Sequence, residues 1–449
     1  MPRPINADLP SAAELPTGEA TREPDSRDRV PLPPGKRRRR RRRSVPGALK
    51  AIGGLFALAI VFVVAAILGG GSAEESDVSG PAPAPVPPAA EQPGESDRAT
   101  TAEQLGFPAF ATSNTTRVGG SDPASNAAAV ALAVYPSTEE ALRPSAVSLV
   151  DTANWQAAIA ASVLMAEPVR APLLLGEAGG LAEPTAAAFD TLDPQGNPES
   201  RGAQVFSIGA AAAPEGLETR AIEPAGPAAT AVAIARLRER LVDQPPQHLI
   251  VASADRPEFA MPAAAWAARS GDPVLFTGPR RLPKATAAAL RRYREARVYV
   301  LGPSSVISSD VVRQIGRIGD GQVRRVSGED PVANAIALAR YADGNFGWNV
   351  NDPGHGFVLA RADSPLDAAA ASALSASGTW GPLLLTDSAD TLPAALRGYL
   401  LDVKPGYTTD PTRAFYNHVW VIGDQEAIDV NQQAQIDALA ELAKIGGEG

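Results

Sequence analysis

The chain has 449 residues, a formal net charge of −9 and no cysteine. Its length is sufficient for two or three domains, and the lack of cysteine excludes disulfide bonds, thiolate metal ligands and thiol nucleophiles. The charge is uneven: residues 1–50 carry 13 Lys or Arg against 6 Asp or Glu, a net +7, whereas the remainder carries 28 against 44, a net −16.

The first 48 residues are rich in Pro, Arg, Asp and Glu, so residues 1–48 are predicted to be a disordered tail. The tail ends in Lys36 and the seven arginines Arg37 to Arg43. An uncharged apolar segment follows, and residues 49–71 are predicted to form one transmembrane helix, because about 20 such residues span a bilayer. The basic block places the tail in the cytoplasm, near anionic lipid headgroups, and the rest of the chain outside the cell.

Two other interpretations of this N-terminal region are a nucleic-acid-binding arm and a cleaved signal peptide. The arginine run lies directly before an apolar segment, which favours a role in membrane topology over nucleic-acid binding. The region before the apolar segment is about 50 residues long, whereas a signal peptide has a short basic region, so an uncleaved single-pass anchor is favoured. Residues 72–112 are rich in Pro and predict a semi-rigid linker between this anchor and the rest.

Several phrases recur in the same order beyond the linker. Three short apolar runs each begin with a proline, at Pro172, Pro273 and Pro382. The phrases "VFSIG", "VYVLG" and "VWVIG" occupy 205–209, 298–302 and 419–423. Three further segments each begin with an arginine, at Arg117, Arg220 and Arg325, and each ends in an Ala-rich helical stretch. Their common order predicts three tandem repeats, at 113–217, 218–321 and 322–449.

Strand and helix signals alternate within each repeat. In the second repeat, the apolar runs "HLIVAS", "PVLFT" and "VYVLG" are separated by helical stretches. Short apolar runs between helices are typical of parallel strands that are buried on both faces, so the predicted fold class is α/β. The Ala-rich helices predict close contacts between repeats, because small side chains let helices approach one another.

These phrases resemble the cell-wall-binding repeat 2 family of Gram-positive surface proteins. A repeat of that family opens with an Arg, a Gly three residues later, an Asp five residues later and Thr-Ala at nine and ten. The matching positions in the first and third repeats are Arg117, Gly120, Asp122, Asn126 and Ala127, and Arg325, Gly328, Asp330, Asn334 and Ala335. The second repeat keeps Arg220 but lacks the Asp, and the family's Asp-Ala-Leu is best matched by Asp367-Ala368-Ala369.

The resemblance implies three toprim-like or Rossmann-like α/β modules that attach a protein noncovalently to the cell wall. The implied partner is a cell-wall polysaccharide or a peptidoglycan-associated polymer, and the implied location is the cell membrane, with the C-terminal part facing the wall. A protein-interaction scaffold that has lost glycan binding is the alternative, with a protein partner at the envelope. A wall hydrolase, or an activator of one, is a third candidate.

Each candidate ligand-binding residue also has a structural interpretation. Arg117, Arg220 and Arg325 are predicted to bind a glycan or a phosphate, or to pair with a neighbouring repeat. Asp122, Asp330 and Asp367 are predicted to accept hydrogen bonds from sugar hydroxyls, or to cap helices. Four tryptophans are candidates for stacking on sugar rings, namely Trp155, Trp266, Trp348 and Trp380. Trp348 lies in the Gly- and Asn-rich loop 343–356 and is the predicted exposed aromatic contact.

No pattern indicates an enzyme. His248, His355 and His418 are scattered, so no metal site is predicted, and there is no phosphate-binding Gly-rich loop or nucleophile elbow. No catalytic residue and no cofactor are therefore assigned. The net −16 after residue 50 disfavours nucleic acid as a partner and also disfavours simple charge attraction to an anionic wall polymer.

Overall fold

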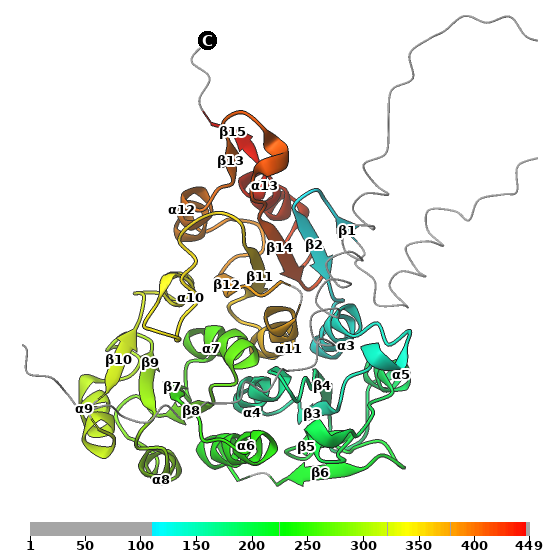
Figure 1. The fold of residues 1–449 in the computed structure, drawn as a ribbon, viewed down its shortest axis with the longest axis vertical. Helices are drawn as coiled ribbons and strands as arrows, with labels where there is room; N and C mark the ends of the chain where they lie inside the picture. Colours follow the sequence, from blue (N-terminus) through cyan, green and yellow to red (C-terminus); the bar gives the residue numbers. More distant parts are fainter. Residues whose placement is uncertain (1–109, 224, 321, 378, 446–449) are drawn as a thin grey trace, which may run out of the picture. The chain divides into compact units, whose positions relative to one another are not determined.

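The computed structural model of the chain describes residues 110–445, except for 224, 321 and 378 (Figure 1). The predicted tail, the predicted transmembrane helix and nearly all of the linker lie outside the described residues. Within the described part, no helix is both long enough and apolar enough to cross a membrane.

Three sheets of four parallel strands make up the fold. The first sheet has the order β4-β3-β5-β6, with β3 Val147–Asp151, β4 Leu173–Gly176, β5 Val205–Ile208 and β6 Thr219–Ile222. The second has the order β10-β9-β7-β8, with β7 His248–Ser253, β8 Val274–Thr277, β9 Arg297–Leu301 and β10 Val323–Val326. The third has the order β2-β14-β11-β12, with β2 Thr115–Val118, β11 Gly356–Arg361, β12 Leu383–Thr386 and β14 His418–Ile422. The predicted parallel α/β class is thereby confirmed, with one antiparallel addition, β1 Phe110–Ala111, on the edge of β2.

The strand that opens each sequence repeat pairs in the sheet of a different repeat. Within the predicted range 218–321, β6 pairs with β5 of the first sheet, and within 322–449, β10 pairs with β9 of the second. The strand β2 of the first range pairs with β14 of the third. The three repeats therefore exchange strands in a closed cycle, in which the N-terminal strand completes the last sheet.

The helices after the exchanged strands return to the sheets of their own repeats. These helices are α3 Pro123–Val134, α6 Pro227–Val242 and α10 Pro331–Arg340, and they contact the edge strands β4, β8 and β12. The outer helices are α5 Glu183–Leu192, α8 Lys284–Arg292, α9 Ser309–Ile318, α12 Ala394–Asp402 and α13 Val430–Ala440. The remaining short elements are η1 Glu140–Leu142, η3 Pro198–Ser200, η4 Pro411–Arg413, β13 Gly406–Tyr407 and β15 Ala443–Lys444.

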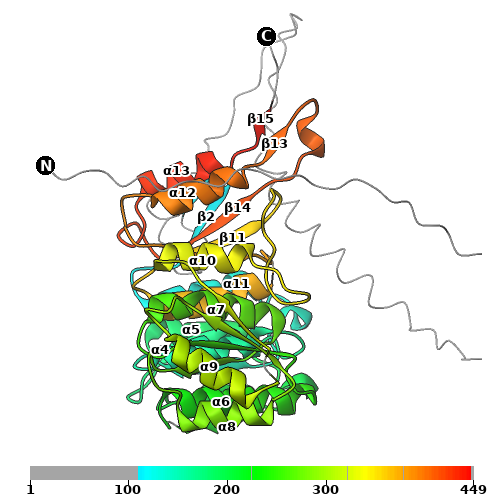
Figure 2. The ribbon, with the colours of Figure 1, turned by 90° about the vertical axis from the view of Figure 1, so that its left-hand side faces the viewer.

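Three Ala-rich helices, one from each repeat, meet at the centre (Figures 1 and 2). They are α4 Trp155–Ala161 with its 3-10 continuation η2 Ser162–Met165, α7 Pro257–Ser270 and α11 Pro365–Ala376. Their alanines are almost completely buried, for example Ala160, Ala264 and Ala370. The small side chains let the helix backbones approach closely, as the sequence predicted.

The strands divide their side chains between a shared inner core and separate outer cores. In β7, Ile250 and Ala252 belong to the core that surrounds the central helices, while Leu249 and Val251 pack against α8 and α9. The same alternation occurs in the other two sheets, because successive side chains of a strand point to opposite faces. Since one inner core is common to all three sheets, no repeat can bury its inner face alone.

Candidate functional site

Arg117 lies on β2 and is only 3% exposed. Its guanidinium donates hydrogen bonds to the carbonyl oxygens of Gly423 and Ile428, at 2.9 and 2.6 Å, and to Oε1 of Gln433. Desolvation lowers the pKa of Arg117 below its ordinary value, although the nearby carboxylates of Asp424 and Asp429 act in the opposite direction. The side chain is therefore occupied in joining the first repeat to the third.

Arg325 has the corresponding role on β10. It donates to the carbonyl oxygens of Gly302 and Ile307, which follow β9, and the second of these bonds is 2.8 Å long. Arg220 occupies the equivalent place on β6 and is half-buried. Of the three arginines predicted to bind a ligand or to pair between repeats, two thus make backbone contacts across a strand exchange.

Asp122 and Asp330 are the N-caps of α3 and α10. A side-chain oxygen of Asp122 accepts hydrogen bonds from the backbone N–H groups of Ala124 and Ser125, at 2.9 and 3.0 Å. Asp330 accepts one from the N–H of Ala333 at 2.8 Å. These bonds satisfy donors that the first turn of a helix leaves without partners. Both carboxylates are exposed, so they also remain accessible to a ligand.

Asp367, at the start of α11, is 9% exposed, and its Oδ1 has no hydrogen-bond partner among the described residues. Desolvation raises the pKa of this carboxyl to about 6, opposed by the amide of Asn126 and assisted by Asp122, Asp363 and Asp424. The corresponding positions in the other repeats are Gln156 and Met261. Asp367 thus lies in a buried contact between the third repeat and the start of α3, and it does not face open solvent.

Trp348 is half-buried, which corrects the expectation of an exposed aromatic side chain. Its ring packs edge-on against Trp266 on α7, with the ring centroids 5.4 Å apart and the planes at 81°. The indole Nε1–H of Trp266 donates to Asp272 at 2.8 Å, and Nδ1 of His248 lies 3.3 Å from the same carboxylate oxygen. The loop 343–356 therefore folds onto the second repeat, because its aromatic side chains complete this cluster.

A groove of about 930 Å³ opens beside this cluster, where all three repeats meet. The loop at Glu167 from the first repeat, the end of α7 from the second and the loop around Trp348 from the third line it. Arg238, which is 7% exposed, donates from α6 to the carbonyl oxygens of Ala166 and Glu167 and holds the first loop in place. Desolvation lowers the pKa of Arg238 to about 10, with Asp272 acting against it.

Trp380 stands at the edge of the groove and is 48% exposed. The guanidinium carbon of Arg269, on the last turn of α7, lies 4.7 Å from the centroid of its ring. The backbone of Trp380 has φ +56°, a left-handed conformation that is unfavourable for a bulky residue. Although Trp380 was one of four tryptophan candidates, its place in the short connector "GTWGP" was the signal that it lies in a loop.

The structure brings Trp348 and Trp380 to one groove, but Arg117, Arg325, Asp122 and Asp367 do not line it. Within the described residues, no group of three or more His, Asp or Glu side chains is placed to hold a metal ion. The groove instead combines aromatic faces with cations and hydrogen-bonding groups, an arrangement suited to binding a polar ligand that also has apolar faces.

Residues 227–312 and 325–432 match the family model for Cell wall binding domain 2 (CWB2). No curated protein sequence matches the chain. Among solved structures, Cwp6 from Clostridium difficile is similar with a TM-score of 0.58 and 18% identity, covering 73% of this chain and 48% of that protein. Cwp8 from Clostridium difficile is similar with a TM-score of 0.54 and 16% identity, covering 77% of this chain and 54% of that one.

This chain therefore spans about half the length of these two proteins, and at such identities the likeness shows the fold. The first matching segment contains β7, β8 and β9 of the second sheet, and the second segment contains β11, β12 and β14 of the third. The second and third repeats are thus similar in sequence to cell wall binding domain 2 (CWB2), and the described unit shares its fold with these two solved structures.

Proposed function

We propose that the chain is a bacterial surface protein whose three repeats bind an envelope glycan or another cell-wall polymer noncovalently. The observation that carries this proposal is the match of 227–312 and 325–432 to the cell wall binding domain, within a unit of three parallel sheets. The strand exchange supports it, because the three repeats form one rigid surface for a long polymer. In this proposal the repeats bind the polymer and do not cleave it.

The N-terminal part of the proposal is a single membrane anchor. The arginine run and the apolar range 49–71 support a cytoplasmic tail, and the Pro-rich range 72–112 would then hold the repeats away from the membrane. Extraction of membranes with alkaline carbonate tests this part. Release of the full chain into the soluble fraction would show that the segment does not anchor it.

Co-sedimentation of the full-length protein with isolated bacterial cell walls tests the binding function. The expected result is a saturable pellet fraction that is absent without walls and absent after heat unfolding of the protein. A second arm uses walls from which proteins have been removed by protease. Retention only on untreated walls would favour the protein-interaction scaffold, and a pellet fraction equal to that without walls would contradict wall binding altogether.

A further inference from the structure

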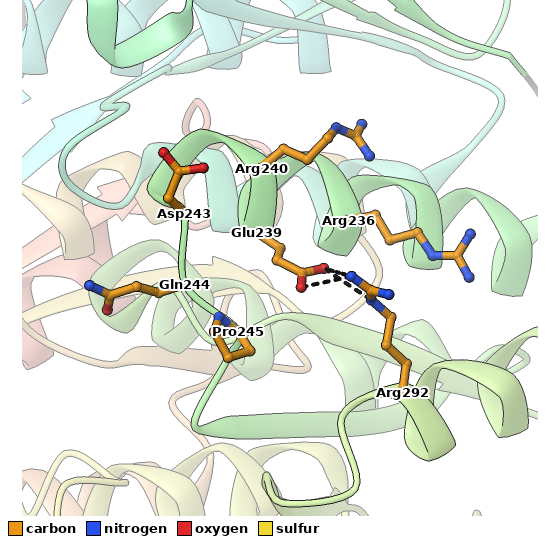
Figure 3. A pocket seen from close by; sticks show the side chains of 7 residues that line it. All are labelled: Arg236, Glu239, Arg240, Asp243, Gln244, Pro245 and Arg292. Carbon is orange, nitrogen blue, oxygen red and sulfur yellow. Dashed lines mark hydrogen bonds and ion pairs between the residues drawn. The ribbon is translucent and has the colours of Figure 1, made fainter.

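A second cavity, of about 540 Å³, adjoins the groove with the tryptophans. The two share Glu239, Gln244 and Pro245 in their walls, so they form one continuous depression. Three arginines line the second cavity, and Figure 3 shows Arg236 and Arg240 extending from α6, with Arg292 facing them from α8. The depression thus has an aromatic end and an arginine-rich end.

The carboxylates at the arginine-rich end are already paired. Glu239 accepts three hydrogen bonds from Arg292, at 2.9, 3.0 and 3.1 Å, and a fourth from the hydroxyl of Tyr293. Asp243 pairs with Arg201 at 2.7 Å. Burial opposes the ionisation of Glu239, but these donors outweigh it and hold its pKa below the ordinary value.

This pairing leaves Arg236 and Arg240 without a carboxylate within ion-pair distance, as far as the described residues show. The two residues are exposed and are four positions apart, so they lie on the same face of α6. Like charges at this spacing repel each other, and an anion placed between them would remove that repulsion.

The charge of the three repeats is also unequal. Residues 218–321 carry 15 Lys or Arg against 10 Asp or Glu, a net +5. Residues 113–217 carry 4 against 11, a net −7, and residues 322–449 carry 8 against 16, a net −8. The negative net charge of the chain therefore conceals one basic repeat, and the arginine-rich end lies on it.

The aromatic end offers Trp380, whose ring is half exposed and has the guanidinium of Arg269 over one of its faces, so the opposite face is the one open to a ligand. An indole face of this kind stacks on the C–H face of a pyranose ring, while a neighbouring guanidinium donates hydrogen bonds to hydroxyl or acidic groups. A saccharide that carries negative charge matches both ends of the depression.

Resting on the proposed wall binding, we infer that this depression is a binding site for an anionic saccharide polymer. A sugar ring stacks on Trp380, and a carboxylate or phosphate of the same polymer lies between Arg236 and Arg240. The site exists only in the assembled unit, because all three repeats contribute to its walls.

Equilibrium binding by the full-length protein tests this inference with three linear probes. They are polygalacturonate, which carries carboxylates, poly(glycerol phosphate), which carries phosphodiesters, and dextran, which is uncharged. The test variants are Trp380→Ala and the double variant Arg236→Gln with Arg240→Gln. Their matched controls are Tyr416→Ala, an exposed aromatic outside the depression, and Arg313→Gln with Arg317→Gln, exposed at the same spacing on α9.

We expect at least one anionic probe to bind more tightly than dextran. Each test variant should weaken that binding roughly tenfold, as a central contact residue does, and the controls should stay within about twofold of the wild type. The double arginine variant should also reduce the salt dependence of binding. Unfolding midpoints equal to that of the wild type show that the variants remain folded.

Wall co-sedimentation separates this inference from the proposed function. Wild-type and test variants that are retained equally on walls would overturn the inference and leave wall binding intact. Equal affinity of the wild type for dextran and the anionic probes, or equal losses in test and control variants, would overturn it as well. Loss of wild-type retention on walls would instead contradict the proposed function itself.

Discussion

The guanidinium Nη1 of Arg117 donates a hydrogen bond of 2.9 Å to the carbonyl oxygen of Gly423, which lies 306 residues further along the chain. Arg117 lies on the N-terminal strand β2, and Gly423 follows β14 in the third repeat. The bond therefore closes a ring of repeats in which the first strand completes the last sheet. Arg325 and Gly302 make the same contact between the third and second repeats.

Replacing Arg117 by Met is expected to lower the free energy of unfolding by about 3 kcal/mol. The variant keeps much of the side-chain volume but leaves several buried carbonyl acceptors without a donor, and each such loss costs about 1–3 kcal/mol. Urea unfolding followed by circular dichroism measures the change. The matched control is Arg220→Met on β6, where the side chain is half-buried, and an equal loss in both variants would contradict the assigned role of Arg117.

Removal of β2 should open the ring. A chain that lacks residues 1–119 loses the edge partner of β14 and the buried side chain of Val118, which belongs to the shared inner core. We expect faster hydrogen exchange in β14 and β11 and a lower unfolding midpoint than in a chain that lacks only 1–109. Identical exchange in the two truncated chains would mean that the third sheet is stable without the exchanged strand.

Asp367→Asn is expected to stabilise the protein near neutral pH. The pKa of Asp367 is raised to about 6, so the folded state holds the proton more tightly than the unfolded state does. The contribution of Asp367 to stability is then greatest at acidic pH and falls as the pH rises between about 4 and 6, by up to about 3 kcal/mol. The Asn variant lacks the ionisable group, so it should lose this fall and exceed the wild type at pH 7.

Asp363→Asn provides a control of opposite sign. The pKa of Asp363 lies below its ordinary value, chiefly because Arg361 donates hydrogen bonds to it, so the ionised form stabilises the fold. Neutralising it should weaken stability at pH 7. Unfolding midpoints measured from pH 4 to 8 distinguish the two variants, and a destabilised Asp367→Asn variant at pH 7 would show that its charge is favourable in the fold.

Replacing the N-caps by alanine separates capping from ligand binding. Asp122→Ala and Asp330→Ala should each cost about 1 kcal/mol of stability, while the asparagine variants at both positions should remain close to the wild type, because Asn caps as well as Asp. Retention on cell walls should be unchanged in all four variants. If the asparagine variants lose retention, the carboxylates contact the wall polymer and are more than caps.

Much of the fold was predictable, because the strands of each repeat are short apolar runs and its helices are Ala-rich stretches. In the second repeat, "HLIVAS", "PVLFT" and "VYVLG" correspond to β7, β8 and β9. The strand exchange was not predictable in the same way. The strand β6 pairs with β5 and not with a strand of its own repeat. Packing between distant segments decides this pairing, so no local sequence pattern indicates it.

The candidate site was less predictable than the fold. Arg117 and Asp122 are singled out by their recurrence, yet recurrence also marks residues that hold each repeat together, and the contacts of both are structural. In the depression, Arg236 has a counterpart in Arg340, but Trp380 has none, because Arg170 and Gly271 occupy the matching positions of the other two repeats. Such a site arises only after three unequal repeats have packed, so a search for shared motifs passes over it.

The tight packing of the central helices predicts that the three repeats share one cooperative core. Ala264 on α7 and Ala370 on α11 are almost completely buried in the inner core that all three sheets share. Enlarging either to Leu should destabilise the protein by about 1–3 kcal/mol, because a close-packed core has no space for the added atoms. The control is Ala288→Leu on the exposed face of α8, where the change should be close to zero. If the repeats were independent, Ala370→Leu would speed hydrogen exchange only in the third sheet. Because the core is shared, exchange should quicken in the strands of all three.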